Sequence, residues 1–306
     1  MENAVSVKNI RKNFGKVEAV RDVSFEVRRG EIFGMLGPNG AGKTTSIRIM
    51  LDIFKANSGE VSVFGGELNE GKKNRIGYLP EERGLYKDMK LEPTLVYLAT
   101  LKGLEEKTAR ARLKTWLDRF DLYDHRQKKI QDLSRGMQQK AQFIATLIHE
   151  PDLIIVDEPF SGLDPVNTRL VKQIILEQRE AGKTIIMSTH QMHQVEALCS
   201  RIVLIDQGKS VLYGEVNQIK RDFSGHAVVI RGQGDFSTLP GVLETRTENG
   251  GWHLTLEADT NPQEIFQALA ANKALNIERF EIAEPSLDDI FVSVVQGNKP
   301  MGGINA

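Results

Sequence analysis

One short segment constrains this chain more than any other, because it combines three glycines with a lysine and a threonine. It fits the pattern G-x-x-x-x-G-K-[ST] and consists of Gly37, Pro38, Asn39, Gly40, Ala41, Gly42, Lys43 and Thr44. Glycines allow backbone N–H groups to close around an anion without a clash from Cβ. The apolar run Ile32–Leu36 precedes the segment, and apolar residues at helical spacing follow it. The order strand, loop and helix favours a phosphate-binding loop over a chance glycine-rich turn.

The residues at the end of this loop predict a nucleoside triphosphate as the ligand. A helix starting at Lys43 would direct the positive end of its dipole at the phosphates. We expect Lys43 to reach the β- and γ-phosphates and the Thr44 hydroxyl to hold Mg²⁺. Thr45, the next residue, is included in the predicted nucleotide-binding set.

A second apolar run ends in two acidic residues. Leu153–Val156 is typical of a buried strand, and Asp157 and Glu158 follow it. We expect Asp157 beside the Mg²⁺ ion and Glu158 one residue beyond, where it would act as the general base that polarises the attacking water. Many strands end in acidic residues, so this signal is specific only in combination with the phosphate loop.

The segment Leu133–Gln139, with sequence LSRGMQQ, resembles the L-S-G-G-Q signature of the ABC ATPases. A serine followed by a glycine at a helix N-terminus makes a second anion site, separate from the first. The resemblance implies that ATP is sandwiched between two copies, with Ser134 and Gly136 of one copy gripping the γ-phosphate held by the other. The alternative is a plain N-cap, which the position between the loop and Asp157 disfavours.

Four further positions are assigned by this resemblance. Glu81, in Tyr78–Glu81, stands where the family has a glutamine that senses the γ-phosphate and Mg²⁺, and Asp164 belongs to a loop that crosses the dimer interface. His190 matches the switch histidine, which contacts the γ-phosphate and holds the water of Glu158 in line; the alternative is an ordinary surface histidine. Phe14 stands where the family stacks an aromatic ring on adenine, and a core phenylalanine is the alternative.

Three residues depart from the family pattern. Arg135 and Met137 replace Gly and Gln in the signature, at positions we expect to be peripheral to the Ser134 and Gly136 contacts. Glu81 replaces glutamine; its carboxylate can still ligate Mg²⁺, but it repels the γ-phosphate more than an amide does. We therefore expect modest ATP turnover until a partner reorders this loop.

The order of elements predicts the fold. Strands alternating with helices indicate an α/β fold with a largely parallel sheet, a P-loop NTPase core with antiparallel β and α-helical subdomains inserted around it. We expect an ATP-binding domain at 1–221, its helical subdomain at about 91–150, a small C-terminal α+β domain at 225–296 and a flexible tail at 297–306.

Composition limits the remaining function classes. The formal net charge of −1 gives no global attraction to nucleic acid, and no window approaches the roughly 20 apolar residues of a membrane span. The N-terminal residues contain no apolar stretch typical of a secretory signal. The single cysteine, Cys199, fits a reducing cytoplasm and is expected to be a buried small side chain.

Longer phrases, IGYLPEERGLY and the segment from Leu133 to Pro165, resemble the drug-, antibiotic- and sodium-efflux branch of the ABC ATPases. That resemblance implies the ATP-hydrolysing subunit of a membrane exporter with a separate polytopic permease and, since one chain holds every motif, a homodimer. We expect it in the cytoplasm, on the inner face of the membrane, and expect no nucleic-acid partner.

Two other functions are open to an ABC ATPase of this kind. A soluble ABC ATPase acting on the ribosome, nucleic acid or an iron–sulfur assembly is disfavoured, since the chain has one phosphate loop and neither heptads nor a cysteine cluster. A regulator with a ligand-sensing C-terminal domain is the other possibility, and dimer support by residues 225–296 is the simpler interpretation of that domain.

Overall fold

A computed structural model describes residues 2–82, 84–224, 227–234, 236, 238–248, 251–257, 260–272, 275–283 and 285–295. The chain divides into two compact units, Met1–Tyr213 and Gly214–Ala306. The division comes earlier than the boundary expected at 221–225. Composition changes only after helix α8 (Val216–Asp222), whereas the packing of the chain places that helix in the second unit. The predicted tail at 297–306 lies outside the described residues.

The first unit is built on a 9-stranded sheet in the order β4-β1-β2-β9-β8-β3-β7-β6-β5. Strands β3, β8, β7, β6 and β5 pair in parallel, whereas β1 pairs antiparallel with both β2 and β4. The mixed α/β fold with an antiparallel portion confirms the predicted fold class. The strands are β1 (Asn3–Phe14), β2 (Val17–Arg28), β3 (Ile32–Leu36), β4 (Ser58–Val63), β5 (Ile76–Leu79), β6 (Leu153–Asp157), β7 (Thr184–Thr189), β8 (Arg201–Asp206) and β9 (Lys209–Glu215).

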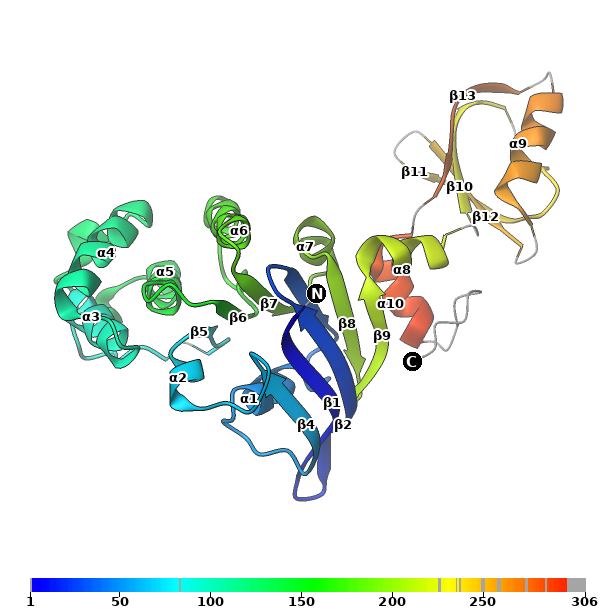
Figure 1. The fold of residues 1–306 in the computed structure, drawn as a ribbon. Coiled ribbons are helices and arrows are strands. Elements are labelled where there is room, and N and C mark those ends of the chain that lie inside the picture. The colour runs from blue at the N-terminus through cyan, green and yellow to red at the C-terminus, as the bar shows by residue number, and fades with distance from the viewer. Residues whose placement is uncertain are drawn as a thin grey trace. The chain divides into compact units, whose positions relative to one another are not determined.

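Helices cover both faces of the parallel strands and form a separate group beyond β5. In Figure 1, α6 and α7 lie on one face of these strands and α1 lies on the other, while α3, α4 and α5 group together at the far end. This group is the predicted helical subdomain. The helices are α1 (Lys43–Met50), α2 (Glu70–Lys73), α3 (Leu91–Leu101), α4 (Glu106–Arg119), α5 (Arg135–Leu147), α6 (Pro165–Glu180) and α7 (Met192–Leu198), with short 3-10 turns at Tyr123–His125 and Ile130–Asp132.

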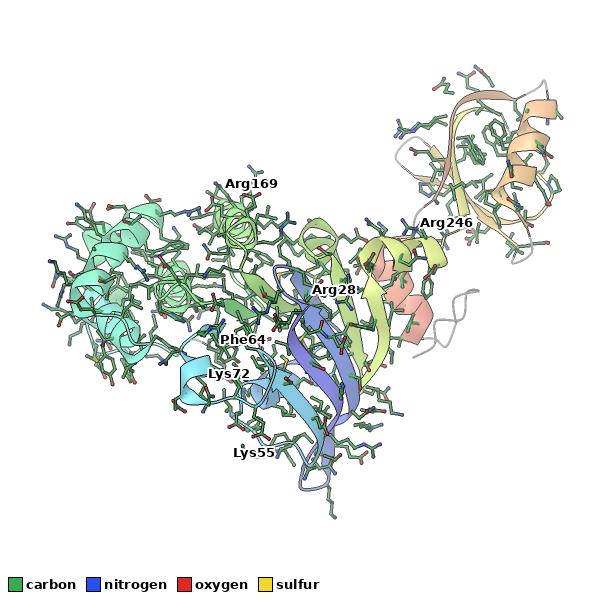
Figure 2. The ribbon with its side chains drawn as sticks, in the orientation of Figure 1. Arg28, Lys55, Phe64, Lys72, Arg169 and Arg246 are labelled. Atoms are coloured by element: carbon green, nitrogen blue, oxygen red, sulfur yellow. The ribbon has the colours of Figure 1, made fainter. Side chains whose placement is uncertain are left out.

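One hydrophobic cluster joins the antiparallel strands to the parallel ones through α1. It contains Val23, Phe25 and Val27, which alternate along β2 and are all buried, together with Ile47 and Met50 of α1. The loop from β4 into α2 packs Phe64 and Leu68 against this cluster and is also held by a lysine. Lys72 Nζ, beside Phe64 in Figure 2, donates to the carbonyl oxygen of Val63 at 2.8 Å.

Local sequence signals placed many elements of the first unit correctly. The turn at Gln207-Gly208 has positive φ at both residues, 45° and 79°, as the two central positions of a type I′ hairpin turn require. Cys199 is buried, with its Sγ close to Gly34, as expected. Strand β5 was not anticipated, because its four residues are too few to establish a period and include a glycine. Among the described residues, none of the helices combines the length and the hydrophobicity that a membrane span requires.

The second unit contains a 4-stranded antiparallel sheet in the order β11-β12-β10-β13. Ile265 and Leu269 of α9 pack with Val228, Ile230 and Leu254 of the sheet in one core cluster. This α+β arrangement matches the elements expected from the sequence. The elements are α8, β10 (Ala227–Gln233), β11 (Val242–Glu248), β12 (Gly251–Leu256), α9 (Pro262–Ala271), β13 (Asn276–Ile282) and α10 (Leu287–Val295).

Candidate functional site

The glycine-rich loop between β3 and α1 has a backbone that only glycine can adopt at two positions. Gly37 has φ 145°, and a Cβ there would lie 2.1 Å from the carbonyl oxygen of Ile205. Gly42, the residue before α1, has φ 108°, and a Cβ there would lie 2.6 Å from the carbonyl oxygen of Ala19. The loop therefore closes against two neighbouring segments while its N–H groups stay free of side-chain bulk.

Lys43, the first residue of α1, is buried, and its ammonium group is held by the loop. Nζ donates to the carbonyl oxygens of Gly37 at 2.7 Å and Pro38 at 3.2 Å. It also lies 4.0 Å from Oε1 of Glu158. Burial lowers the pKa of the Lys43 ammonium, and the negative charges of Glu158, Asp157 and Glu81 oppose that shift. A cation is thus kept ready for phosphate oxygens in a largely dehydrated position.

Asp157 ends β6 and contacts α1. Its Oδ2 accepts a hydrogen bond from the Thr44 hydroxyl at 2.8 Å, and its Oδ1 accepts one from Ser188. Asp157 is 1% exposed. A carboxylate and a hydroxyl side by side are hard oxygen donors of the kind that Mg²⁺ selects, and a Mg²⁺ ion bound with phosphates needs only one or two such side chains. Thr44 and Asp157 therefore fit this ion.

Glu158 directly follows β6, and residues at the end of β7 hold its carboxylate by hydrogen bonds. Thr189 donates to its Oε2 at 3.1 Å, and the backbone N–H of His190 donates to its Oε1 at 3.0 Å. The imidazole Nδ1 of His190 lies 2.9 Å from the same Oε1. Glu158 has φ 49°, a left-handed conformation that is uncommon outside glycine. Its carboxylate is buried, whereas the His190 side chain is 48% exposed.

The loop, Lys43, Thr44, Asp157 and Glu158 border one cleft of about 340 Å³, large enough for the phosphates of a nucleotide, whereas His190 is not among its lining residues. Thr45 and Glu81 contribute to its wall together with the loop and the two acidic residues. Glu81 itself is exposed. The lining residues are Ala19, Asn39, Gly40, Gly42, Lys43, Thr44, Thr45, Glu81, Asp157 and Glu158.

Phe14 does not line this cleft. It ends β1 and is 44% exposed, so the alternative of a core phenylalanine is wrong. Its ring contacts that of Phe54 edge-to-face, with 5.3 Å between the centroids. The ammonium Nζ of Lys12 lies over the Phe14 ring, 5.2 Å from its centroid. The ring is thus partly exposed, with a cation on it that a stacking partner would have to accommodate or displace.

The two predicted anion contacts of the signature segment lie at the start of α5, outside the cleft lining. The Ser134 side chain accepts from the backbone N–H of Met137 at 3.3 Å, which makes Ser134 an N-cap. A Cβ at Gly136 would meet no atom within 4 Å. The surface at Gly136 is therefore open in a single copy, as a site completed by a second copy would be.

Asp164 likewise lies outside the cleft lining, as the N-cap of α6. Its Oδ1 accepts from the backbone N–H groups of Val166 and Asn167, both at 2.9 Å. Hydrogen bonds from the backbone and the side chain of Asn167 lower the pKa of the Asp164 carboxyl. The side chain is exposed, and its charge stabilises the helix start.

Sequence reasoning did not name Ser188 and Thr189, which contact the two acidic residues. The available signal was a run of polar residues, Ser188, Thr189 and His190, at the end of an otherwise apolar strand. Their partners became visible only through the pairing of β7 with β6, in which Ser188 lies opposite Asp157.

Comparison with known proteins gives two family matches. The sequence pattern of the family described as "ABC transporter" matches residues 20–161. The pattern described as "ATP-binding protein DrrA1-3-like, C-terminal domain" matches residues 214–295, which begins where the second compact unit begins.

Individual relatives agree with these matches. The chain is 42% identical over 294 residues to the uncharacterized ABC transporter ATP-binding protein YhaQ of Bacillus subtilis (strain 168), covering 95% of this chain and 98% of the relative. It is 31% identical to the Nod factor export ATP-binding protein I of Ralstonia nicotianae, covering 94% and 92%. A solved structure of an ATP-binding subunit of an ABC transporter superposes with a TM-score of 0.68 at 32% identity, covering 72% of this chain and 93% of that one.

Proposed function

The chain belongs to the ABC transporter family as an ATP-binding subunit that hydrolyses ATP to power transport, and on that premise we propose how it does so. Two copies close on two ATP molecules and drive export through a separate membrane-spanning permease. The observation that carries the proposal is the grip on Glu158, whose carboxylate is held by His190 and Thr189 within 4.0 Å of Lys43.

Residues in and beside the cleft have distinct roles in this scheme. The glycine-rich loop and Lys43 bind the β- and γ-phosphates, and Glu158 accepts a proton from the attacking water as general base. His190 supports that water and contacts the γ-phosphate. Thr44 and Asp157 hold Mg²⁺, with Glu81 as a further oxygen donor from the cleft wall. The bound ion would neutralise charge on the phosphates.

The second copy completes the site. Ser134 and Gly136 of one copy are proposed to contact the γ-phosphate held by the other, and Asp164 to lie at the interface between the copies. Support comes from the open surface at Gly136 and from the position of both helix starts outside the cleft of their own chain. Phe14, whose side chain is partly exposed, is proposed to stack on adenine.

The permease is proposed to dock on the helical subdomain and on the loop at 81–88. Large apolar side chains are exposed there without a packing role in the core: Tyr86, Met89, Tyr97 and Leu101. The rings of Tyr86 and Tyr97 lie 6.5 Å apart, so two aromatic side chains form one patch. Aromatic residues and methionine are enriched at protein interfaces, which supports a protein partner. Such docking would hold the subunit at the inner face of the membrane.

Export is proposed as the direction of transport. One relative is by description a Nod factor export protein, and the second unit matches the DrrA1-3-like C-terminal domain. The relatives give no support to a ribosome- or nucleic-acid-directed ATPase. We propose dimer support as the role of residues 225–296; unchanged ATP-driven dimerisation after deletion of 225–306 would count against that role.

Two experiments test the proposal. The first compares ATP turnover of the full chain with that of Glu158→Gln, which should lose at least about 100-fold in kcat while still binding ATP. Turnover close to that of the parent would reject Glu158 as the base. The second tags the protein in its native cell and identifies what co-purifies after mild solubilisation. A polytopic membrane protein in stoichiometric amount supports the transporter complex, whereas ribosomes or nucleic acid would contradict it.

A further inference from the structure

We propose that Thr189 is the positioning residue for the general base, fixing the orientation of the Glu158 carboxylate. The inference rests on the proposed role of Glu158. It concerns a side chain whose hydrogen bonds go to Glu158 and to the backbone of Gln191.

The first support is the pairing of two parallel strands. Asp157, the last residue of β6, lies opposite Ser188 of β7, so the residues that follow on each strand are brought level. The backbone N–H of Glu158 then donates to the carbonyl oxygen of Ser188 at 3.0 Å. The backbone pairing alone therefore makes Glu158 and Thr189 neighbours, independently of the contact between their side chains.

The second support is that the hydroxyl of Thr189 takes part in two hydrogen bonds. Its oxygen accepts a hydrogen bond from the backbone N–H of Gln191 at 3.1 Å. Because an ionised carboxylate can only accept, the hydroxyl donates its proton to Oε2 of Glu158, at 3.1 Å. The N–H of Gln191, in the turn that follows β7, helps to orient that proton.

The third support is what each oxygen of the carboxylate has as a partner. Oε1 receives the backbone N–H of His190 and lies 2.9 Å from its Nδ1, whereas Thr189 is the donor on Oε2. The terminal torsion of a glutamate is soft and roughly two-fold. Contacts at one oxygen alone leave the carboxylate plane free to turn, and a donor on the second oxygen fixes the plane.

Burial makes this contact effective. Thr189 is 1% exposed and Glu158 is 6% exposed, so water has little access to replace the hydroxyl. A carboxylate accepts about four hydrogen bonds. The contacts above leave capacity for the proton of one water, held in a fixed direction by the plane of the carboxylate.

The test compares Thr189→Val, which keeps the shape and removes the hydroxyl, with Thr189→Ser, which keeps the hydroxyl. Steady-state ATP hydrolysis by the full chain should show kcat reduced by about 10- to 100-fold in the valine variant, with KM for ATP changed less than about two-fold. The serine variant should recover kcat to within about three-fold of the parent. Equal losses in both variants, or a valine variant within about two-fold of the parent, would overturn the proposal.

A matched control lies on the same strand. Thr184 is also buried, and its hydroxyl oxygen accepts a hydrogen bond from the backbone N–H of Gly30 at 3.0 Å, at the other end of β7. Thr184→Val removes a buried hydroxyl of the same strand and should leave kcat within about two-fold of the parent. A loss equal to that of Thr189→Val would mean a general structural effect of the strand and would overturn the proposal.

A double-mutant cycle separates this inference from the proposal on which it rests. If Thr189 acts through Glu158, adding Thr189→Val to Glu158→Gln should lower kcat by no more than about two-fold further. A further loss as large as in the parent background would overturn the positioning role. Should Glu158→Gln itself keep parental turnover, the general-base assignment would fail, and a large effect of Thr189→Val would then contradict its action through that residue.

Discussion

The imidazole Nδ1 of His190 lies 2.9 Å from Oε1 of Glu158, and both side chains come from the carboxyl ends of neighbouring parallel strands. The carboxylate is buried and the imidazole half-exposed, so the histidine side chain links the proposed base to the protein surface. A ligand that moves the His190 side chain would therefore change the hydrogen bonding of the proposed base.

Removal of this imidazole should slow hydrolysis without weakening ATP binding. In His190→Ala the backbone N–H that donates to Glu158 Oε1 remains, so the carboxylate keeps part of its support. We expect kcat to fall about 10- to 100-fold and KM for ATP to change less than about three-fold. Steady-state ATPase assays measure both constants. A rise in KM that accounts for the whole loss would assign His190 to binding rather than to catalysis.

Replacing the glutamate of the cleft wall by glutamine should raise basal turnover. Glu81 shares the cleft with Asp157 and Glu158, and a third carboxylate repels the γ-phosphate where an amide would not. We expect Glu81→Gln to hydrolyse ATP a few-fold faster than the parent in the absence of a partner. Glu82→Gln, at the neighbouring exposed position, is the control. An ATP turnover that is unchanged in Glu81→Gln would contradict the proposal that Glu81 restrains the resting enzyme.

A methyl group added at Gly136 should impair the assembly of two copies without destabilising the fold of one copy. Because a Cβ there meets nothing within 4 Å, Gly136→Ala is expected to leave the free energy of unfolding unchanged or to raise it by up to about 1 kcal/mol. If Gly136 approaches the γ-phosphate held by a second copy, the same methyl group should weaken ATP-driven dimerisation. Thermal unfolding and light scattering with ATP measure the two effects. Undiminished dimerisation would place Gly136 away from the interface.

Acid should destabilise the first unit through a buried histidine. Burial lowers the pKa of His149 to about 4 from an ordinary value of 6.5, while Nε2 lies 3.2 Å from the carbonyl oxygen of Ile76. Between these values the unfolded chain binds a proton that the folded chain does not, so this contribution is complete above pH 6.5 and is lost as pH falls toward 4. The full loss is roughly 3 kcal/mol.

Denaturant unfolding at several pH values between 7 and 4, followed by circular dichroism, checks this expectation. The variant His149→Gln lacks the titrating group and should show a shallower loss of unfolding free energy over that range. His193→Gln, at an exposed histidine, should keep the parental slope. Parallel curves for the parent and His149→Gln would contradict the assignment.

Much of the site was predictable because its parts are contiguous in sequence. The phosphate loop needs glycine at positions 37 and 42 for steric reasons, and the sequence pattern already includes both glycines. The apolar run Leu153–Val156 predicts a strand, and two carboxylates follow it. Strand β5 escaped prediction for the opposite reason, since four residues carry too little periodicity. The contacts of the chain divide it after Tyr213, whereas its composition changes only after helix α8.

Local sequence patterns specify the separate parts of the site: a strand, loop and helix that cradle phosphates, two carboxylates after a buried strand, and a serine and a glycine at a helix start. Which of these parts come together depends on the order of the strands in the sheet. The order β3-β7-β6 inserts β7 between the strand of the loop and the strand of the carboxylates. Thr189 and His190 thereby reach Glu158 across a separation of about 30 residues in the chain. Hydrogen bonds between strands depend on the order of the strands in the sheet. That order is set by the packing of the whole core, so a local sequence pattern does not predict it.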